Sequence, residues 1–247
     1  MGNGESSAQS EVKIALRNGL QGIINQKLES NNKINNITNI TRLDKEEGNA
    51  LYMEKIHHIL STSTNDKHFP RPEYIDKDDN WLLLGGFYSS KLIENYTKNY
   101  NITHVINMAE GDSGNPIERR KAHTDLDINY IAFPAEDSAE YRITTHWGDI
   151  KKFIDEYLKL SSSSSIDNTY RGRLLIHCMA GVNRSASLAI AIICYTEKKT
   201  LFEAVAQVRE KKGHILTNIY FRNDLINWGR EEGCLEIHKR EIGKSNL

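Results

Sequence analysis

The chain has 247 residues, which is enough for one fair-sized domain with extensions or for two very small domains. Hydrophobic residues make up 38% of the sequence and charged residues 26%, a balance that permits a packed core beneath a well-solvated surface. The 32 basic and 33 acidic residues give a formal net charge of -1, which argues against binding of nucleic acid over the whole surface but is compatible with a local basic patch.

The first part of the chain is expected to be an extension, residues 1–41. Its first ten residues are rich in Gly, Asn and Ser and are predicted to be disordered. Apolar residues recur every fourth position from Val12 to Leu28, which predicts an amphipathic helix. An Asn-rich linker, Asn31 to Asn39, follows it, and a second helix is predicted from Asp44 to Leu60.

The N-terminal sequence Met1-Gly-Asn-Gly-Glu-Ser6 fits the pattern that precedes N-myristoylation, with Gly2 as the acceptor after removal of Met1. The pattern is short, so a chance match is the alternative. One myristoyl chain binds a membrane only weakly and reversibly. The membrane association that the pattern predicts is therefore weak, and the helix over 12–28 is expected to lie on the membrane, to pack on the domain or to be locally disordered.

No apolar run reaches the roughly 18 residues of a membrane-spanning helix, and no secretion signal opens the sequence. We therefore expect a cytoplasmic protein, in part membrane-associated or nuclear. The three cysteines, Cys178, Cys194 and Cys234, are too widely spaced for a disulfide framework or a zinc site. Reduced thiols and no metal are expected. Cys194 lies in an apolar run and is predicted to be a core residue.

From residue 81 onward, short apolar runs alternate with helical patterns, which predicts a layered α/β domain whose central, mostly parallel sheet is flanked by helices. Loops are expected at Ser61–Asp79 and in the serine run Ser161–Ser165. The predicted strands are Trp81–Leu84, Thr103–Met108, Tyr130–Phe133 and Arg173–His177. The predicted helices are Lys91–Tyr100, Thr144–Leu160, Arg184–Lys198, Thr200–Lys211 and Asn218–Glu231.

The segment His177-Cys-Met-Ala-Gly-Val-Asn-Arg184-Ser185 lies between a predicted strand and a predicted helix. Such a junction holds a phosphate group easily, because free backbone N–H groups and the positive end of the helix dipole meet there. Gly181 permits the backbone angles of a tight loop. The expected phosphate-binding residues are Met179, Ala180, Gly181, Val182 and Asn183.

The same loop predicts chemistry at Cys178. Its N–H groups, the helix dipole and Arg184 favour a thiolate, which can attack phosphorus and form a phospho-enzyme. Arg184 offers a planar fork of donors that follows the phosphate oxygens into the transition state. Ser185 is expected to donate a hydrogen bond to the departing sulfur, and His177 to orient the loop. The alternative is a buried cysteine with an unrelated surface arginine.

The motif HCMAGVNRSAS resembles the signature of the dual-specificity phosphatases, and LLLGGFYSS, ITHVINMAEG, FPAEDS and ILTNIYFRNDL resemble other segments of that family. The resemblance covers roughly residues 81–228 and is greatest to the small atypical members. It implies a cysteine-phosphatase-like fold with a phosphate-binding loop between strand and helix. It also implies that Asp137, which precedes Cys178 by 41 residues, is the general acid. Glu136 and Glu140 are the local competitors, and a simple turn between Asp137 and Ser138 is the alternative.

Three further residues have expected roles at the site, the first of them by the same resemblance. Asn218 is expected to tie its own loop to the phosphate loop, and a helix N-cap is an equally compatible role. Arg142 and Lys211 are candidates for binding a second phosphate or an acidic side chain at the mouth of the site. For both, an ordinary solvated charge is the alternative.

The sequence thus predicts a phosphatase that acts on phosphotyrosine and on phosphoserine or phosphothreonine, with a phosphorylated protein as partner. A phosphoinositide or RNA 5′-phosphatase on the same loop is less favoured, because the loop lacks lysines and the near-zero net charge gives no support for a basic approach surface. A catalytically weak phosphoprotein-binding module is the remaining alternative. No nucleic acid and no cofactor are expected. The predicted domains are the extension 1–41, the catalytic domain 42–232 and a polar tail 233–247.

Overall fold

The computed structural model describes residues 48–62, 72–77, 80–87, 99–112, 116–163 and 172–235. The chain divides into two units, Met1–Leu51 and Tyr52–Leu247. Only residues 48–51 of the first unit are described, so the fold below is that of the second. The helix predicted over 12–28, the Asn-rich linker, Gly2 and most of the helix predicted over 91–100 lie outside the described residues.

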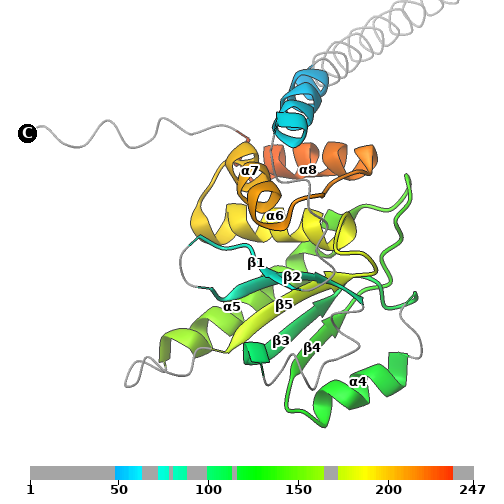
Figure 1. Cartoon of the computed structure of the whole chain (residues 1–247), viewed down its shortest axis with the longest axis vertical. Helices are drawn as coiled ribbons and strands as arrows, with labels where there is room; N and C mark the ends of the chain where they lie inside the picture. The colour runs from blue at the N-terminus through cyan, green and yellow to red at the C-terminus, as the bar shows by residue number, and fades with distance from the viewer. Residues whose placement is uncertain are drawn as a thin grey trace, which may run out of the picture. The chain divides into compact units, whose positions relative to one another are not determined.

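The second unit is built on a five-stranded sheet with the strand order β1-β2-β5-β3-β4 (Figure 1). β1 pairs antiparallel with β2, and all other neighbours pair parallel. This confirms the predicted α/β class with a mostly parallel sheet. The strands are β1 Glu73–Tyr74, β2 Leu82–Gly86, β3 Ile102–Asn107, β4 Asn129–Ala132 and β5 Arg173–Cys178.

Both faces of the sheet are buried. Successive side chains of a strand point to opposite faces, so neighbouring residues enter different core clusters. Leu84 and Ile176 are cross-strand partners and belong to the larger core cluster, whereas the adjacent partners Leu83 and Leu175 belong to the smaller one. All four are fully buried. This alternation explains why β2 and β5 are continuous apolar runs in the sequence.

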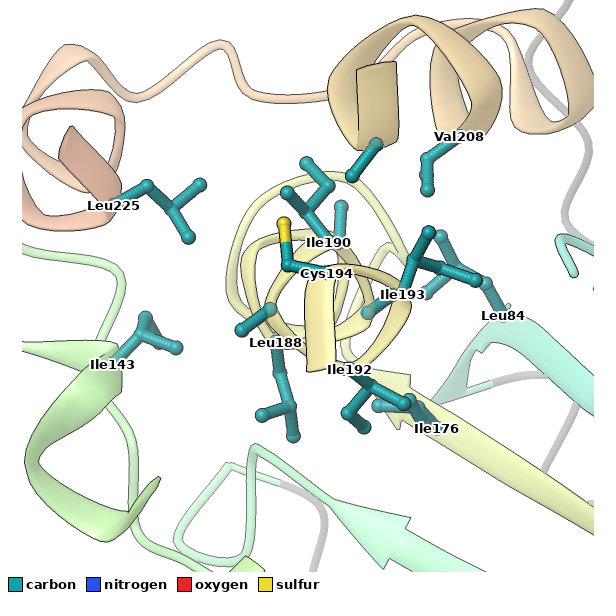
Figure 2. Close-up of a cluster of buried hydrophobic side chains, with 14 of the residues drawn as sticks. Leu84, Ile143, Ile176, Leu188, Ile190, Ile192, Ile193, Cys194, Val208 and Leu225 are labelled. Atoms are coloured by element: carbon teal, nitrogen blue, oxygen red, sulfur yellow. The ribbon is translucent and has the colours of Figure 1, made fainter. Parts of the chain in front are cut away.

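Helices surround this sheet. α6 is apolar on nearly all sides and lies between the strands and α7 and α8 (Figure 1). In the larger cluster it contacts Leu84 and Ile176 from the sheet, Ile143, Val208 and Leu225 (Figure 2). The helical elements are α4 Pro116–Thr124, the 3-10 helix η1 Ile143–His146, α5 Trp147–Ser163, α6 Arg184–Glu197, α7 Leu201–Lys212 and α8 Ile219–Glu231, and residues 48–62 are also helical.

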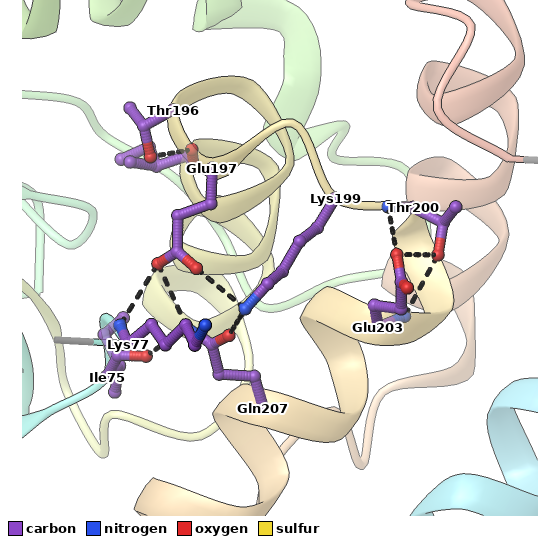
Figure 3. A network of polar contacts seen from close by, with 9 residues as sticks. Ile75, Lys77, Thr196, Glu197, Lys199, Thr200, Glu203 and Gln207 are labelled. Atoms are coloured by element: carbon purple, nitrogen blue, oxygen red, sulfur yellow. Dashed lines mark hydrogen bonds and ion pairs between the residues drawn. The ribbon is translucent and has the colours of Figure 1, made fainter. Parts of the chain in front are cut away.

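The turn between α6 and α7 is fixed by polar contacts (Figure 3). Lys198 has a positive φ of 55°, which ends α6. Thr200 begins α7 with a capping box, in which its side chain accepts from the backbone of Glu203 and the Glu203 side chain accepts from the backbone of Thr200. Lys199 forms an ion pair of 2.8 Å with Glu197.

The structure differs from the expected elements in four places. α5 continues to Ser163, so residues 161–163 of the segment predicted as the loop Ser161–Ser165 are helical. β1 lies inside the segment predicted as a loop, because two residues at a sheet edge give no periodic signal. α4 was not predicted, since its exposed sequence PIERRKAHT has no apolar stripe, although Pro116 at its first position is a common helix start. The helix predicted from Thr144 begins as the 3-10 turn η1.

None of the helices in the described ranges combines the length and the apolar character needed to cross a membrane. Cys194 is 4% exposed within the core, as expected.

Candidate active site

The predicted phosphate loop, residues 179–183, connects the last residue of β5, Cys178, with the first residue of α6, Arg184. Gly181 has a φ of 75°, and a Cβ atom there would lie 2.8 Å from the carbonyl oxygen of Gly85. Only glycine fits both restrictions. The loop is also bound to the end of β2, because the backbone N–H of Phe87 donates to the carbonyl of Met179 at 2.9 Å. The parallel pairing of β2 with β5 thereby shapes the loop.

The sulfur of Cys178 accepts two hydrogen bonds. The backbone N–H of Gly181 lies 3.3 Å from it, and the hydroxyl of Ser185 lies 3.1 Å from it. Cys178 is 2% exposed, so both donors act in a largely water-free environment. Each donor stabilises negative charge on the sulfur, which is the form that attacks phosphorus.

Arg184 is held from one side. Its Nη1 donates to the carboxylate of Asp112 at 2.6 Å and to the carbonyl of Ala135 at 2.8 Å. Its Nε is buried and has no hydrogen-bond partner among the described residues. A buried donor without a partner is costly. The two Nη1 contacts therefore fix the guanidinium plane, and the buried Nε–H is left available to donate to an oxygen of a bound anion.

Asp137 lies in the segment between β4 and η1, and its carboxylate reaches the phosphate loop. One oxygen accepts from the side-chain amide of Asn183 at 3.0 Å, and the other accepts from the amide of Asn218 at 2.8 Å. Glu136 and Glu140, the two competing acids, are exposed like Asp137. Of the three, Asp137 is the one whose carboxylate accepts a hydrogen bond from a loop residue in the described part of the chain.

Asn218 makes both of the contacts expected of it. Its side-chain oxygen accepts from the backbone N–H of Tyr220 at 3.0 Å and so caps α8. Its own backbone N–H donates to the side-chain oxygen of Asn183 at 3.1 Å, which joins its loop to the phosphate loop. A backbone bond of 2.9 Å from Leu216 to Val182 runs beside it.

The other predicted residues are His177, Arg142 and Lys211, which lie on three different elements. His177 is fully buried in β5, and its carbonyl accepts from the backbone of Met108 at 2.8 Å. Arg142 is exposed at the start of η1, where its charge acts on Asp224. Lys211 lines a separate cavity of about 470 Å³ on α7 with Lys77, and none of the lining residues belongs to the phosphate loop.

Three contributors to the site were missed from the sequence. Asp112 and the Ala135 carbonyl hold Arg184, and neither carries a motif. Lys212, at the end of α7, is 1% exposed, and burial lowers the pKa of its ammonium group to about 8, although the charges of Glu73 and Cys178 act in the opposite direction. Its sequence context, a run of charged residues, predicts a solvated side chain and gave no signal of this burial.

Tyr141 lies four residues after Asp137. Its hydroxyl is buried and lacks a hydrogen-bond partner in the described ranges. Burial raises the pKa of this hydroxyl, whereas the charge of Arg184 lowers it. Among the described residues there is no group of three or more His, Cys, Asp or Glu side chains arranged to bind a metal ion.

Comparison with protein families gives one match that covers most of the described fold. The model of the dual specificity phosphatase catalytic domain matches residues 82–231. Dual specificity protein phosphatase 13B from Homo sapiens is 30% identical over 170 residues, 63% of this chain and 76% of that protein. Dual specificity protein phosphatase 26 from Bos taurus is 32% identical over 126 residues, 51% of this chain and 53% of that protein.

A third relative, dual specificity protein phosphatase Mpk3 from Drosophila melanogaster, is 30% identical over 131 residues, which are 28% of its length. The chain thus spans about half of the length of phosphatase 26 and less than a third of the length of Mpk3. Among solved structures, the human tyrosine phosphatase-like serine/threonine/tyrosine-interacting protein is 25% identical with a TM-score of 0.53, covering 66% of this chain and 99% of that one. Human DUSP28, at 14% identity and a TM-score of 0.52 over 69% of this chain and 99% of that one, shares the fold.

Proposed function

Because this chain belongs to the dual specificity phosphatase family, we propose that it hydrolyses phosphotyrosine and phosphoserine or phosphothreonine in proteins through a cysteinyl-phosphate intermediate. The observation that carries the proposal is the environment of Cys178. Its sulfur accepts hydrogen bonds from the Ser185 hydroxyl at 3.1 Å and from the Gly181 backbone N–H at 3.3 Å. Cys178 itself directly precedes the loop that leads to Arg184.

The proposed first step is transfer of the phosphoryl group to sulfur. The amides of residues 179–183 and the Nε of Arg184 bind the phosphoryl oxygens. The Cys178 thiolate attacks phosphorus, so that the P–S bond forms while the P–O bond to the substrate breaks. Asp137 gives its proton to the departing oxygen, which leaves as a neutral hydroxyl group. Arg184 contributes most where negative charge is spread over the transferring group.

The second step returns the enzyme to its starting state. Asp137, now a carboxylate, takes a proton from water, and the water oxygen attacks phosphorus. The P–S bond breaks, and the hydroxyl of Ser185 donates a hydrogen bond to the leaving sulfur. Inorganic phosphate departs, and Asp137 again carries the proton for the next cycle. The reaction needs no metal or organic cofactor, because the nucleophile and the proton carrier are side chains.

The loop composition favours a protein substrate. None of the loop residues Met179, Ala180, Val182 and Asn183 is cationic. A multiply phosphorylated headgroup would be better bound by lysines there. A phosphoinositide phosphatase, an RNA 5′-phosphatase and a phosphoprotein-binding module are therefore the competing functions that the experiment must separate.

The test measures turnover of 4-nitrophenyl phosphate by the wild-type chain, by Cys178→Ser and by the control Cys234→Ser. We expect turnover in the wild type and the control, and none in Cys178→Ser. Phosphopeptides, phosphoinositides and 5′-triphosphate RNA are then compared by kcat/KM. Preferential turnover of lipid or RNA would overturn the proposed substrate, and tight phosphopeptide binding without turnover would indicate a binding module.

The catalytic domain is proposed to extend from about residue 42 to 232, further than the matched segment. The helical residues from Tyr52 onward support an extension of the domain beyond the matched segment, as far as the start of the unit Tyr52–Leu247. Ile56 is fully buried, and the Tyr52 ring lies 5.7 Å from that of Phe202. Arg209 donates to the carbonyl of Leu60 at 3.2 Å. Removal of residues 52–62 should therefore lower the free energy of unfolding by several kcal/mol, given the burial of an isoleucine alone.

Where Met1 is the initiator residue, the motif around Gly2 supports weak, reversible membrane association through a myristoyl chain. Metabolic labelling with an alkynyl myristate analogue tests this. We expect label on the wild type and none on Gly2→Ala, and an unlabelled wild type would refute it.

A further inference from the structure

The side chain of Asn183 lies where three segments of the site meet. Asn183 is in the phosphate loop, directly before Arg184. Its amide nitrogen donates to Asp137 at 3.0 Å. Its side-chain oxygen accepts from the hydroxyl of Thr217 at 3.0 Å and from the backbone N–H of Asn218 at 3.1 Å. One amide therefore links the phosphate loop, the acid segment and the segment before α8.

These contacts fix which end of the amide faces Asp137. The backbone N–H of Asn218 can only donate, so the atom of Asn183 next to it must be the oxygen. The nitrogen then has to point the other way, and there it meets an oxygen of Asp137. The orientation follows from donor and acceptor chemistry and leaves no equivalent flipped arrangement.

The second oxygen of Asp137 is held in a similar manner. The amide nitrogen of Asn218 donates to it at 2.8 Å, and the oxygen of the same amide is occupied by the backbone N–H of Tyr220. Asp137 itself is exposed, so without these donors its carboxylate would sample several rotamers. Two oriented amides restrict it to one position.

Resting on the function proposed above, we propose that Asn183 is a positioning residue for Asp137. It fixes the proton donor relative to the loop that holds the phosphate, because Asn183 and Arg184 are consecutive residues of that loop. When Asp137 is protonated, one oxygen carries the proton to the leaving group and the other still accepts an amide hydrogen bond. Asn183 thus acts on the proton-transfer steps and touches neither phosphorus nor the leaving oxygen.

The proposal predicts a dependence on the leaving group. Phenol is a poor leaving group and needs its oxygen protonated, whereas 4-nitrophenol leaves readily as an anion. Loss of one hydrogen bond to the protonated carboxyl group changes the population of the oriented acid by up to about tenfold. Asn183→Ala should therefore lower kcat/KM for phenyl phosphate by up to about tenfold more than for 4-nitrophenyl phosphate.

Ser187→Ala is the matched control, because the Ser187 hydroxyl donates to the backbone carbonyl of Asn183 at 2.9 Å and leaves its amide side chain untouched. This variant should keep the wild-type ratio of the two substrates. In an Asp137→Ala background, Asn183→Ala should not change the ratio further, since the residue through which it acts is gone. Asn183→Ser provides a second variant, because serine is favoured at a helix start and its hydroxyl is too short to replace the amide.

An equal loss on both substrates, or an unchanged ratio in both Asn183 variants, would overturn the positioning role. A change of ratio that persists without Asp137 would also overturn it. Failure of the proposed function looks different, because Cys178→Ser would then retain the turnover of the wild type, whatever happens at Asn183.

Discussion

The Nη1 atom of Arg184 lies 2.6 Å from the carboxylate of Asp112, a residue 72 positions earlier in the chain. The arginine side chain is 6% exposed and the aspartate side chain 54%. A half-exposed carboxylate in the turn after β3 therefore orients a nearly buried guanidinium at the start of α6. Since the same nitrogen also donates to the Ala135 carbonyl, the guanidinium of Arg184 is held in one orientation.

We expect Asp112→Asn to weaken phosphate binding more than it weakens the fold. An ion pair with one exposed partner contributes at most about 1 kcal/mol to stability. Misalignment of the Arg184 guanidinium should raise KM and the inhibition constant of inorganic phosphate by about three- to tenfold. Steady-state kinetics and urea unfolding measure the two effects separately.

Glu110→Gln is the control for this experiment. It breaks the ion pair of 2.5 Å between Glu110 and Arg120, in which the arginine side chain is 50% exposed. Phosphate inhibition should stay at the wild-type value in this variant. If inorganic phosphate inhibits Asp112→Asn as strongly as it inhibits Glu110→Gln, Arg184 is aligned by the Ala135 carbonyl alone.

Gly181→Ala should abolish most of the activity. The φ of 75° costs a residue with a Cβ atom about 1–2 kcal/mol, and the added atom would meet the Gly85 carbonyl at 2.8 Å. The loop must shift to relieve this contact, which moves the amides that are proposed to bind phosphate. We expect a loss of kcat/KM of about 100-fold, since small displacements of catalytic groups have effects of that size.

Gly148→Ala is a matched glycine substitution with the opposite expected sign. Gly148 lies in α5, and a Cβ atom there meets nothing within 4 Å. Alanine should raise the free energy of unfolding by up to about 1 kcal/mol and leave kcat/KM unchanged. Equal melting temperatures of Gly181→Ala and Gly148→Ala would contradict the strain assigned to the phosphate loop.

Strand–helix alternation and the phosphate motif were enough to predict the sheet class and the location of the Cys178 loop. Local patterns carried that information, because buried strands are apolar and the loop residues are contiguous. The hydrogen bond between Asp137 and Asn183 joins residues 46 positions apart. It depends on side-chain orientation, which a periodic sequence pattern does not reveal. The burial of Lys212 was equally invisible, since it follows from how α7 packs against the sheet rather than from its own polar sequence.

Ser185→Ala should separate the two chemical steps. The Ser185 hydroxyl lies 3.1 Å from the Cys178 sulfur and can stabilise it as a leaving group. Its loss should slow hydrolysis of the phosphocysteine more than its formation, so that kcat falls about tenfold or more. Rapid-quench measurements with 4-nitrophenyl phosphate should then show a burst of nitrophenol equal to the enzyme concentration. An absent burst, with both steps slowed alike, would assign the hydroxyl to loop structure.

The buried ammonium group of Lys212 predicts an unusual dependence of stability on pH. Its pKa in the folded protein is about 8, below the 10.5 of a solvated lysine, and burial is the cause. Below about pH 8 the group is charged in both states, so that its burial opposes folding. Between the two pKa values the unfolded chain binds more protons, and the free energy of unfolding rises with pH. The total effect is at most about 3 kcal/mol.

Lys212→Met removes this contribution because it keeps the length of the side chain without the charge. Urea unfolding of both proteins at about pH 7 and about pH 9.5 isolates it from other groups, such as the tyrosines whose raised pKa values act in the opposite direction at high pH. Relative to Lys212→Met, the wild type should gain stability as pH rises between these values. A difference between the two proteins that stays constant with pH would mean that Lys212 remains charged in the folded protein throughout, held by Glu73 and the Cys178 thiolate.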